Sequence, residues 1–257
     1  MSAVLRHHSQ ALYHQNSGQH DSAKRKIFLL TIYLPVGIFD SIHRHTQDSK
    51  RRCVDMAKSR KDATREKILN VALALFVRKG YNGTSVDEIT HTAELTKGAL
   101  YGHFKSKAEL LLTLIEEFRI RFIQEMINTT DRENIGALDK LHQIVSFNAQ
   151  FAIENQSLCV LPTFLTFERK EHREFEIALK EVYQEYKNYI AKIIKQGQRE
   201  GAFRKDLNPD LTAITFIGIH DGTLHQWLLN QDRIDGKQFV KTFRQVFFEG
   251  IQSTPPK

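Results

Sequence analysis

The chain has 257 residues, of which 41% are apolar, and it carries a net charge of +7 at neutral pH. This apolar content is enough for a packed core, and only five prolines and thirteen glycines argue against an all-β or repetitive fold. Two cysteines are too few for a disulfide framework or a zinc site, so we expect a reduced, cytoplasmic setting. The positive charge favours an acidic partner, either nucleic acid or an anionic membrane.

Residues 1–55 differ from the rest of the chain. They hold half of the twelve histidines and show no sustained helical or strand period. Their one apolar run, 27–39, is shorter than the roughly 20 residues of a membrane helix, and Pro35 and Gly37 interrupt it, so no membrane association is expected. We expect a disordered extension. An alternative is that translation starts at Met56, because AGG codons for Arg51 and Arg52 would form a bacterial ribosome-binding sequence upstream of it.

Helical periodicity dominates from residue 60 onward and predicts an all-α fold. Ile68, Ala72 and Phe76 share one stripe of a first helix that ends at Gly80. Thr84 or Ser85 then caps a short helix.

A second short helix is expected from about Thr96 to Gly102. Ser106 caps the longer helix that follows, and Glu109 completes its capping box.

The rest of the chain also reads as helix. Further helices are expected at about 135–155, 171–198, 208–230 and 236–251, and Pro162 interrupts the helical pattern between the first two. We therefore expect a three-helix domain over 60–106 and a larger helical domain over 107–257.

The two short helices joined by a tight turn are typical of a helix-turn-helix, whose second helix enters the major groove of DNA. Leu100 and Phe104 are expected to point inward, which leaves the polar residues beside them to face outward. The DNA-binding candidates are Thr84, Ser85, Thr96, Lys97, Gly98, Tyr101, His103 and Lys107. For Lys107 the alternative is an ordinary surface lysine, for Tyr101 a core aromatic, and for His103 a structural role.

Residues 60–115 resemble the TetR family of bacterial transcriptional regulators. The resemblance rests on Ile68, Ala72, Phe76, Gly80-Tyr81, Thr84-Ser85-Val86, Ile89, Ala93, Lys97 to Tyr101, His103-Phe104, Ser106-Lys107 and Leu110. It implies an Ω-shaped homodimer with N-terminal DNA-binding units and C-terminal domains that bind a ligand. Two residues depart from the family pattern: Glu94 stands where a turn glycine is usual, and Thr90 where alanine is common. Glu94 would be strained if its φ were positive.

The ligand-binding domain must be interpreted from its side chains. Candidate pocket residues are Phe147, Phe151, Phe164, Phe167, Tyr183, Tyr186, His220 and Trp227. For each aromatic residue among them ordinary core is the more common role, and His220 with Asp221 could instead only satisfy a neighbouring helix. The pair His220-Asp221 lies in an apolar helix and needs partners. Gly218 and Gly222 lie four residues apart, so another backbone can approach there, either within one subunit or across a dimer formed by helices 208–230 and 236–251.

The function predicted from these features is a homodimeric, sequence-specific repressor that a small-molecule effector releases from a double-stranded DNA operator. No catalytic constellation, phosphate loop or metal-ligand spacing is present in the sequence, so neither an enzyme nor a cofactor is expected. An activator and an architectural DNA-binding protein remain alternatives.

Overall fold

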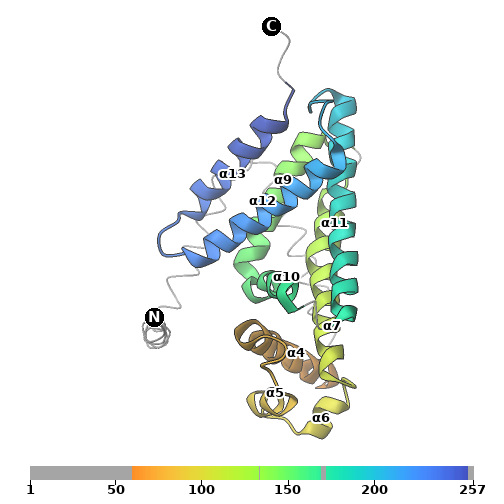
Figure 1. The fold of residues 1–257 in the computed structure, drawn as a ribbon, viewed down its shortest axis with the longest axis vertical. Helices are drawn as coiled ribbons and strands as arrows, with labels where there is room; N and C mark the ends of the chain where they lie inside the picture. The colour runs from red at the N-terminus through yellow and green to blue at the C-terminus, as the bar shows by residue number, and fades with distance from the viewer. Residues whose placement is uncertain (1–59, 133, 169–171, 254–257) are drawn as a thin grey trace. The chain divides into compact units, whose positions relative to one another are not determined.

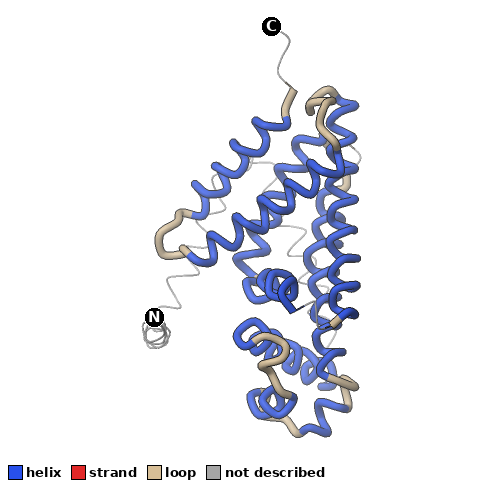
Figure 2. The backbone as a smooth tube through the Cα atoms, in the orientation of Figure 1, coloured by secondary structure: helices blue, strands red, loops and turns tan. Residues whose placement is uncertain are grey.

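The structure, a computed structural model, describes residues 60–132, 134–168 and 172–253. Within these residues the regular elements are helices (Figure 2), apart from an isolated antiparallel bridge between Phe203 and Gln252. The all-α fold class is therefore confirmed. The expected extension, residues 1–55, lies outside the described residues.

Three helices build the N-terminal domain: α4 (Arg60–Lys79), α5 (Val86–Thr92) and α6 (Lys97–Tyr101) (Figure 1). Ile68 and Phe76 of α4, Ile89 of α5 and Leu100 of α6 are fully buried against one another, and Phe104 closes this core from the segment after α6. The short helices α5 and α6 are too short to be stable alone, and so this shared core holds them.

The turn between α5 and α6 contains a strained residue. Glu94 has a φ of +52°, and among the described residues it is the one non-glycine with positive φ. Left-handed backbone costs a residue with a side chain about 1–2 kcal/mol. The turn keeps its geometry because the Leu95 N–H donates to the Thr90 carbonyl at 2.9 Å and Lys67 lies 3.4 Å from the Glu94 carboxylate. Thr90, the other departure from the family pattern, is buried and donates to the Asp87 carbonyl.

A continuous helical rod leads from the N-terminal domain into the C-terminal one. It consists of α7 (Lys107–Phe118), a π-helix η1 (Arg119–Gln124) and α8 (Glu125–Thr130). Ser106 caps α7 by accepting from the Glu109 N–H at 3.1 Å, so the predicted N-cap is confirmed. The Glu109 carboxylate accepts from the N–H of Lys105, the residue before the cap, instead of from Ser106 itself. The π-helix was not predicted.

Beyond this rod, the described part of the C-terminal domain consists of α9 (Ala137–Glu154), α10 (Gln156–Glu168), α11 (Arg173–Glu200), α12 (Pro209–Leu229) and α13 (Gly236–Ile251). The long helix α11 packs against α7, α9, α10 and α12, and so it is the central element of the domain. The helix α10 was not expected as a separate element, and Pro162 lies inside it instead of ending it.

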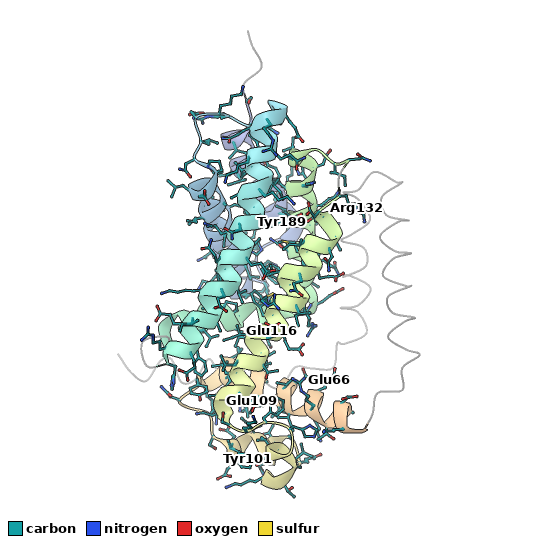
Figure 3. The ribbon with its side chains drawn as sticks, turned by 90° about the vertical axis from the view of Figure 1, so that its right-hand side faces the viewer. Glu66, Tyr101, Glu109, Glu116, Arg132 and Tyr189 are labelled. Carbon is teal, nitrogen blue, oxygen red and sulfur yellow. The ribbon has the colours of Figure 1, made fainter. Side chains whose placement is uncertain are left out.

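Two contacts fix α11 in this domain. The hydroxyl groups of Tyr189 in α11 and Thr130 in α8 are hydrogen-bonded at 2.7 Å and buried; Figure 3 shows Tyr189 on α11. Near its C-terminal end, Gly197 packs directly on the buried ring of Phe203: a Cβ added to this glycine would lie 2.0 Å from a ring carbon. The chain reversal after α11 therefore depends on the absence of a side chain at Gly197.

Candidate nucleic-acid interface and effector site

The helix α6 presents one polar face to solvent. Thr96 is its N-cap and accepts from the Ala99 N–H at 3.1 Å, and both Lys97 and Gly98 are exposed in its first turn. Tyr101 is 51% exposed, which is unusual for a side chain of this size, and Figure 3 shows it at the end of the domain farthest from α11. Because Leu100 is buried on the opposite side, the orientation predicted for this helix is confirmed.

Ser85 and Asp87, at the start of α5, lie beside this face. Ser85 is exposed and caps α5 by accepting from the Glu88 N–H at 3.1 Å. The Lys97 ammonium forms an ion pair with Asp87 of α5, whose side chain is also exposed, and this interaction raises the pKa of Lys97. Exposed pairs of this kind contribute little to stability, and so Lys97 can exchange Asp87 for another anion at small cost.

Thr84 and Lys107 lie inside the domain instead. The Thr84 side chain is 2% exposed, and its hydroxyl donates to the Gly80 carbonyl at 2.9 Å. The Lys107 ammonium donates to the carbonyl oxygens of Tyr81 and Thr84, both at 2.8 Å, and lies 4.1 Å from the centre of the Tyr81 ring. Both side chains therefore hold the segment between α4 and α5. His103 is half-buried beside Phe104, with 6.4 Å between ring centres.

Tyr81 joins the two domains. Its ring makes edge contacts with His172 and Phe175, at centroid distances of 4.7 and 4.9 Å, at the start of α11. Burial, and then the nearby Glu174 carboxylate, raises the pKa of Tyr81. The segment held by Lys107 is thus packed directly on the long helix of the C-terminal domain.

An aromatic cluster surrounds Phe122 of η1 in the C-terminal domain. The Phe122 ring lies between 5.0 and 6.2 Å, centre to centre, from five other rings. These rings belong to Phe118, Phe147, Phe151, Tyr186 and His220. Four of the predicted pocket residues are therefore brought together, and Phe122, which the sequence did not single out, is their common neighbour.

Polar groups are set into this cluster. Tyr186 accepts a hydrogen bond from the Asn148 amide at 3.0 Å, and Asn148 is 2% exposed. The Tyr183 hydroxyl, also a predicted pocket residue, donates to Asp221 at 3.0 Å. The Nδ1 atom of His220 lies 3.4 Å from the other Asp221 oxygen, but it is buried and its geometry forms no hydrogen bond.

Three predicted pocket residues are not placed in the cluster. Trp227 packs at the other end of α12, where its indole nitrogen would lie 3.5 Å from a Cβ on Gly236 of α13. Phe164 and Phe167 belong to α10, but their side chains lie outside the described part of the chain. Asn148 could have been found from the sequence, because it is a polar residue on the apolar stripe formed by Leu141, Val145 and Ala152.

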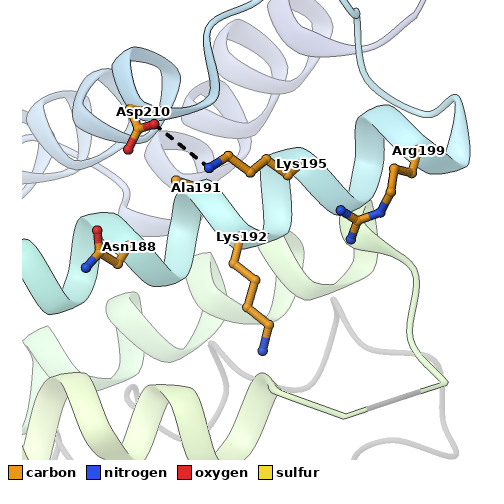
Figure 4. Close-up of a pocket in the computed structure, with 6 residues that line it drawn as sticks. All are labelled: Asn188, Ala191, Lys192, Lys195, Arg199 and Asp210. Carbon is orange, nitrogen blue, oxygen red and sulfur yellow. Dashed lines mark ion pairs between the residues drawn. The ribbon is translucent and has the colours of Figure 1, made fainter.

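A separate depression of about 370 Å³ lies on the outer surface of α11 (Figure 4). Its lining is Asn188, Ala191, Lys192, Lys195 and Arg199 from α11, and Asp210 from α12. It opens to solvent and is bordered by long charged side chains, two of which already pair with acids: Lys192 with Asp131 at 2.9 Å, and Lys195 with Asp210 at 4.0 Å. Small-molecule sites are usually mostly apolar, and by this criterion the aromatic cluster is the better candidate.

One face of α12 exposes apolar side chains. Leu211, Ile214 and Leu229 are between 54 and 64% exposed. Gly218 and Gly222 lie between them on the same face, and a Cβ added to either glycine would meet no atom within 4 Å. On α13, Val246 is 67% exposed. None of the helices in the described ranges has both the length and the apolar character needed to cross a membrane.

The sequence matches two family profiles that together span the described helices. Residues 68–114 match the profile described as "Bacterial regulatory proteins, tetR family". Residues 116–250, more than half of the chain, match "YsiA-like protein, C-terminal region".

Curated relatives align over most of their length. The chain is 24% identical to a fatty acid metabolism regulator protein of Bacillus subtilis (strain 168), over 72% of this chain and 94% of that protein. It is 25% identical to the HTH-type transcriptional repressor DhaR of Mycobacterium sp. (strain GP1), over 73% of this chain and 91% of that one.

Solved structures share the fold. The MbdR regulator from Azoarcus sp. CIB matches with a TM-score of 0.67 and 29% identity, covering 73% of this chain and 98% of that one. The regulator FadR from Bacillus subtilis, solved in complex with stearoyl-CoA, matches with a TM-score of 0.63 and 23% identity, covering 72% of this chain and 98% of that one.

Proposed function

This chain belongs to the TetR family of bacterial transcriptional regulators, and we propose that it is a homodimeric repressor that a small molecule, bound at the Phe122 cluster, releases from its operator. The observation that carries the proposal is the helix α6, which buries Leu100 and exposes a continuous polar face. Relatives of this chain include repressors. DNA binding is the activity that an exposed polar face on such a helix supports.

The polar face of α6 supplies the proposed contacts with DNA. The Tyr101 hydroxyl donates to a phosphate, and Lys97 leaves Asp87 for a phosphate or a guanine edge. Gly98 allows close approach, since the nearest atom to an added Cβ is the Thr96 hydroxyl at 3.8 Å. Ser85 contacts the backbone of the adjacent strand. We assign Thr84 and Lys107 a supporting role, because their polar atoms are engaged within the protein.

The exposed faces of α12 and α13 are the proposed dimer interface. Exposed apolar side chains at Leu211, Ile214 and Leu229 leave a surface that burial against a second copy would remove from water. Gly218 and Gly222 meet no atom of their own chain, and so they leave space for a partner helix. This favours close approach between subunits over close packing within one subunit. A four-helix interface of this kind holds two copies of α6 in position to contact the two half-sites of a DNA operator.

The proposed path from effector to DNA is the rod formed by α7, η1 and α8. Its first residue, Lys107, holds the segment before α5, and its π-helix carries Phe122 into the aromatic cluster. An effector that displaces the Phe122 ring would shift α7 and change the spacing of the two recognition helices. By linkage, a ligand that binds this altered form better must weaken operator binding.

Operator binding across a salt series tests the proposal. The protein is titrated with DNA flanking its own gene, and bound subunits are counted by analytical ultracentrifugation. We expect salt-sensitive binding to a palindromic site with two subunits or more per site. Replacing Leu211 and Leu229 by Glu should give monomers that bind the site weakly, while Lys205→Glu, an exposed change in the loop between α11 and α12, serves as the control. Binding without sequence preference would refute the proposed repressor.

A further inference from the structure

The Phe122 cluster contains a deeply buried hydrogen-bond acceptor without a partner. Asn148 is 2% exposed and uses its amide nitrogen on Tyr186, while its Oδ1 has no hydrogen-bond partner among the described residues. Leaving a buried polar atom unpaired costs about 1–3 kcal/mol. Buried polar atoms are paired in most proteins, and an exception is often a place where something else binds.

A second acceptor lies toward the solvent side of the same cluster. The Asp221 carboxylate is about 40% exposed and accepts one hydrogen bond, from Tyr183. Its other oxygen faces His220 Nδ1 at 3.4 Å without forming a hydrogen bond, and the His220 ring stacks on Phe122 at 6.2 Å. The carboxylate therefore has capacity for a further donor.

The surroundings of these two acceptors are mostly apolar, although the Arg121 guanidinium acts on the pKa of Cys159 in the direction opposite to burial and to Asp221. Burial raises the pKa values of Tyr183, Tyr186 and Cys159, and the Asp221 carboxylate raises them further, so these groups stay neutral at physiological pH. Asp221, which adjoins the cluster beside His220 and accepts from Tyr183, carries a negative charge there. An anion placed there would meet a carboxylate and lose its water, whereas a donor would satisfy atoms that now lack a partner.

We propose that the effector is a flat apolar molecule that carries a hydrogen-bond donor, an amine or a hydroxyl, and that Asp221 and Asn148 accept from it. This inference rests on the proposed function for the existence of an effector, but it makes a separate claim about chemical class. The aromatic side chains bind the flat part of the molecule by stacking, and the two acceptors select the polar group.

A matched series of naphthalenes tests the class. Naphthylmethylamine and naphthol carry donors, naphthoate is an anion without one, and methoxynaphthalene is neutral without one. Dissociation constants are measured by isothermal titration calorimetry on the full chain. We expect the amine to bind at least about tenfold more tightly than methoxynaphthalene, because hydrogen bonds to charged groups are among the stronger ones. Naphthoate should bind most weakly of the four.

Two variants locate the site. Asp221→Asn keeps an acceptor for Tyr183 but removes the charge, and it should reduce the preference for the amine over methoxynaphthalene by about tenfold. Asp210→Asn removes a carboxylate from the start of the same helix, at the surface depression, and should leave the preference unchanged. A change with Asp210→Asn alone would place the bound amine at the depression and overturn the inference.

The outcomes separate the two proposals. Binding of naphthoate or of stearoyl-CoA in preference to the donors, or no binding by any naphthalene, overturns the proposed class. Operator binding is measured in the same samples. If the donor compounds bind through Asp221 but the protein stays bound to its operator, the proposed chemical class of the ligand is upheld. The proposal that a ligand at this cluster releases the operator is then refuted.

Discussion

The position of Lys107 gives a sharp prediction. Its ammonium makes two hydrogen bonds to backbone carbonyls and lies over the Tyr81 ring. Charged hydrogen bonds contribute about 1.5–3 kcal/mol each, and a cation–π contact about 0.5–1 kcal/mol, but the side chain is half-buried, which reduces these values. Lys107→Met retains the apolar stem and removes the charge. We expect the free energy of unfolding to fall by about 2–4 kcal/mol.

Urea unfolding followed by circular dichroism measures the stability of this variant. Operator titration over a salt series measures the number of phosphates that the protein contacts. A residue that contacts phosphate adds about 0.9 to the slope of log affinity against log salt. The slope for Lys107→Met should equal that of the parent, even where affinity falls. Lys105→Met, at an exposed lysine two residues earlier, is the control for stability. A slope reduced by about one with unchanged stability would refute the structural role and restore a phosphate contact.

Three further predictions concern other parts of the molecule. Tyr101→Phe should weaken binding to all operators alike, by about 1 kcal/mol, with no loss of stability, as gel-shift titration on several sequences would show; loss on one sequence alone would indicate a base contact. Gly197→Ala should destabilise the fold by about 1–3 kcal/mol in urea, because the new Cβ overlaps the Phe203 ring, and Phe203→Leu should recover part of this loss in the double variant. Burial raises the pKa of Cys159 from 9.0 to about 12, so the folded state binds this proton more tightly than the unfolded state does. The stabilisation that comes from this neutral thiol is fully present below about pH 9 and is lost as the pH rises toward 12. The free energy of unfolding should fall by about 1.4 kcal/mol at about pH 10, and Cys159→Ala should show a smaller decline.

Local chemistry explains which parts of the fold could be predicted. Ser106 and Glu109 specify a helix start through atoms within four residues. Glu94 was singled out because it stands where the family usually has a turn glycine, and its positive φ fits that departure. The helix α10 was missed because Pro162 suggests a break, although the surrounding packing keeps this segment helical. Tertiary packing therefore overrode a local signal.

The candidate site was harder to predict, because contacts between residues far apart in the sequence decide it. The sequence places Lys107 near DNA, but its partners are carbonyls 23 and 26 residues earlier, which only the packing of α4 on α7 brings within reach. Phe122 keeps the four-residue spacing from Phe118, but it escaped notice because no candidate was sought between the helix capped by Ser106 and the helix expected at 135. The neighbouring aromatics Phe147, Phe151 and Tyr186 keep regular helical spacing, and these were found.

The π-helix η1 also affects how this chain can tolerate a change in length. A π-helical turn holds one more residue than an α-helical turn while the helix continues on both sides in the same direction. Deleting one residue from Arg119–Gln124 would convert η1 to α-helix and leave α7 and α8 facing their present neighbours. The same deletion in α9 would turn every later side chain of that helix by about 100°. A single-residue deletion in η1 would therefore reshape the aromatic cluster without disturbing the recognition helix.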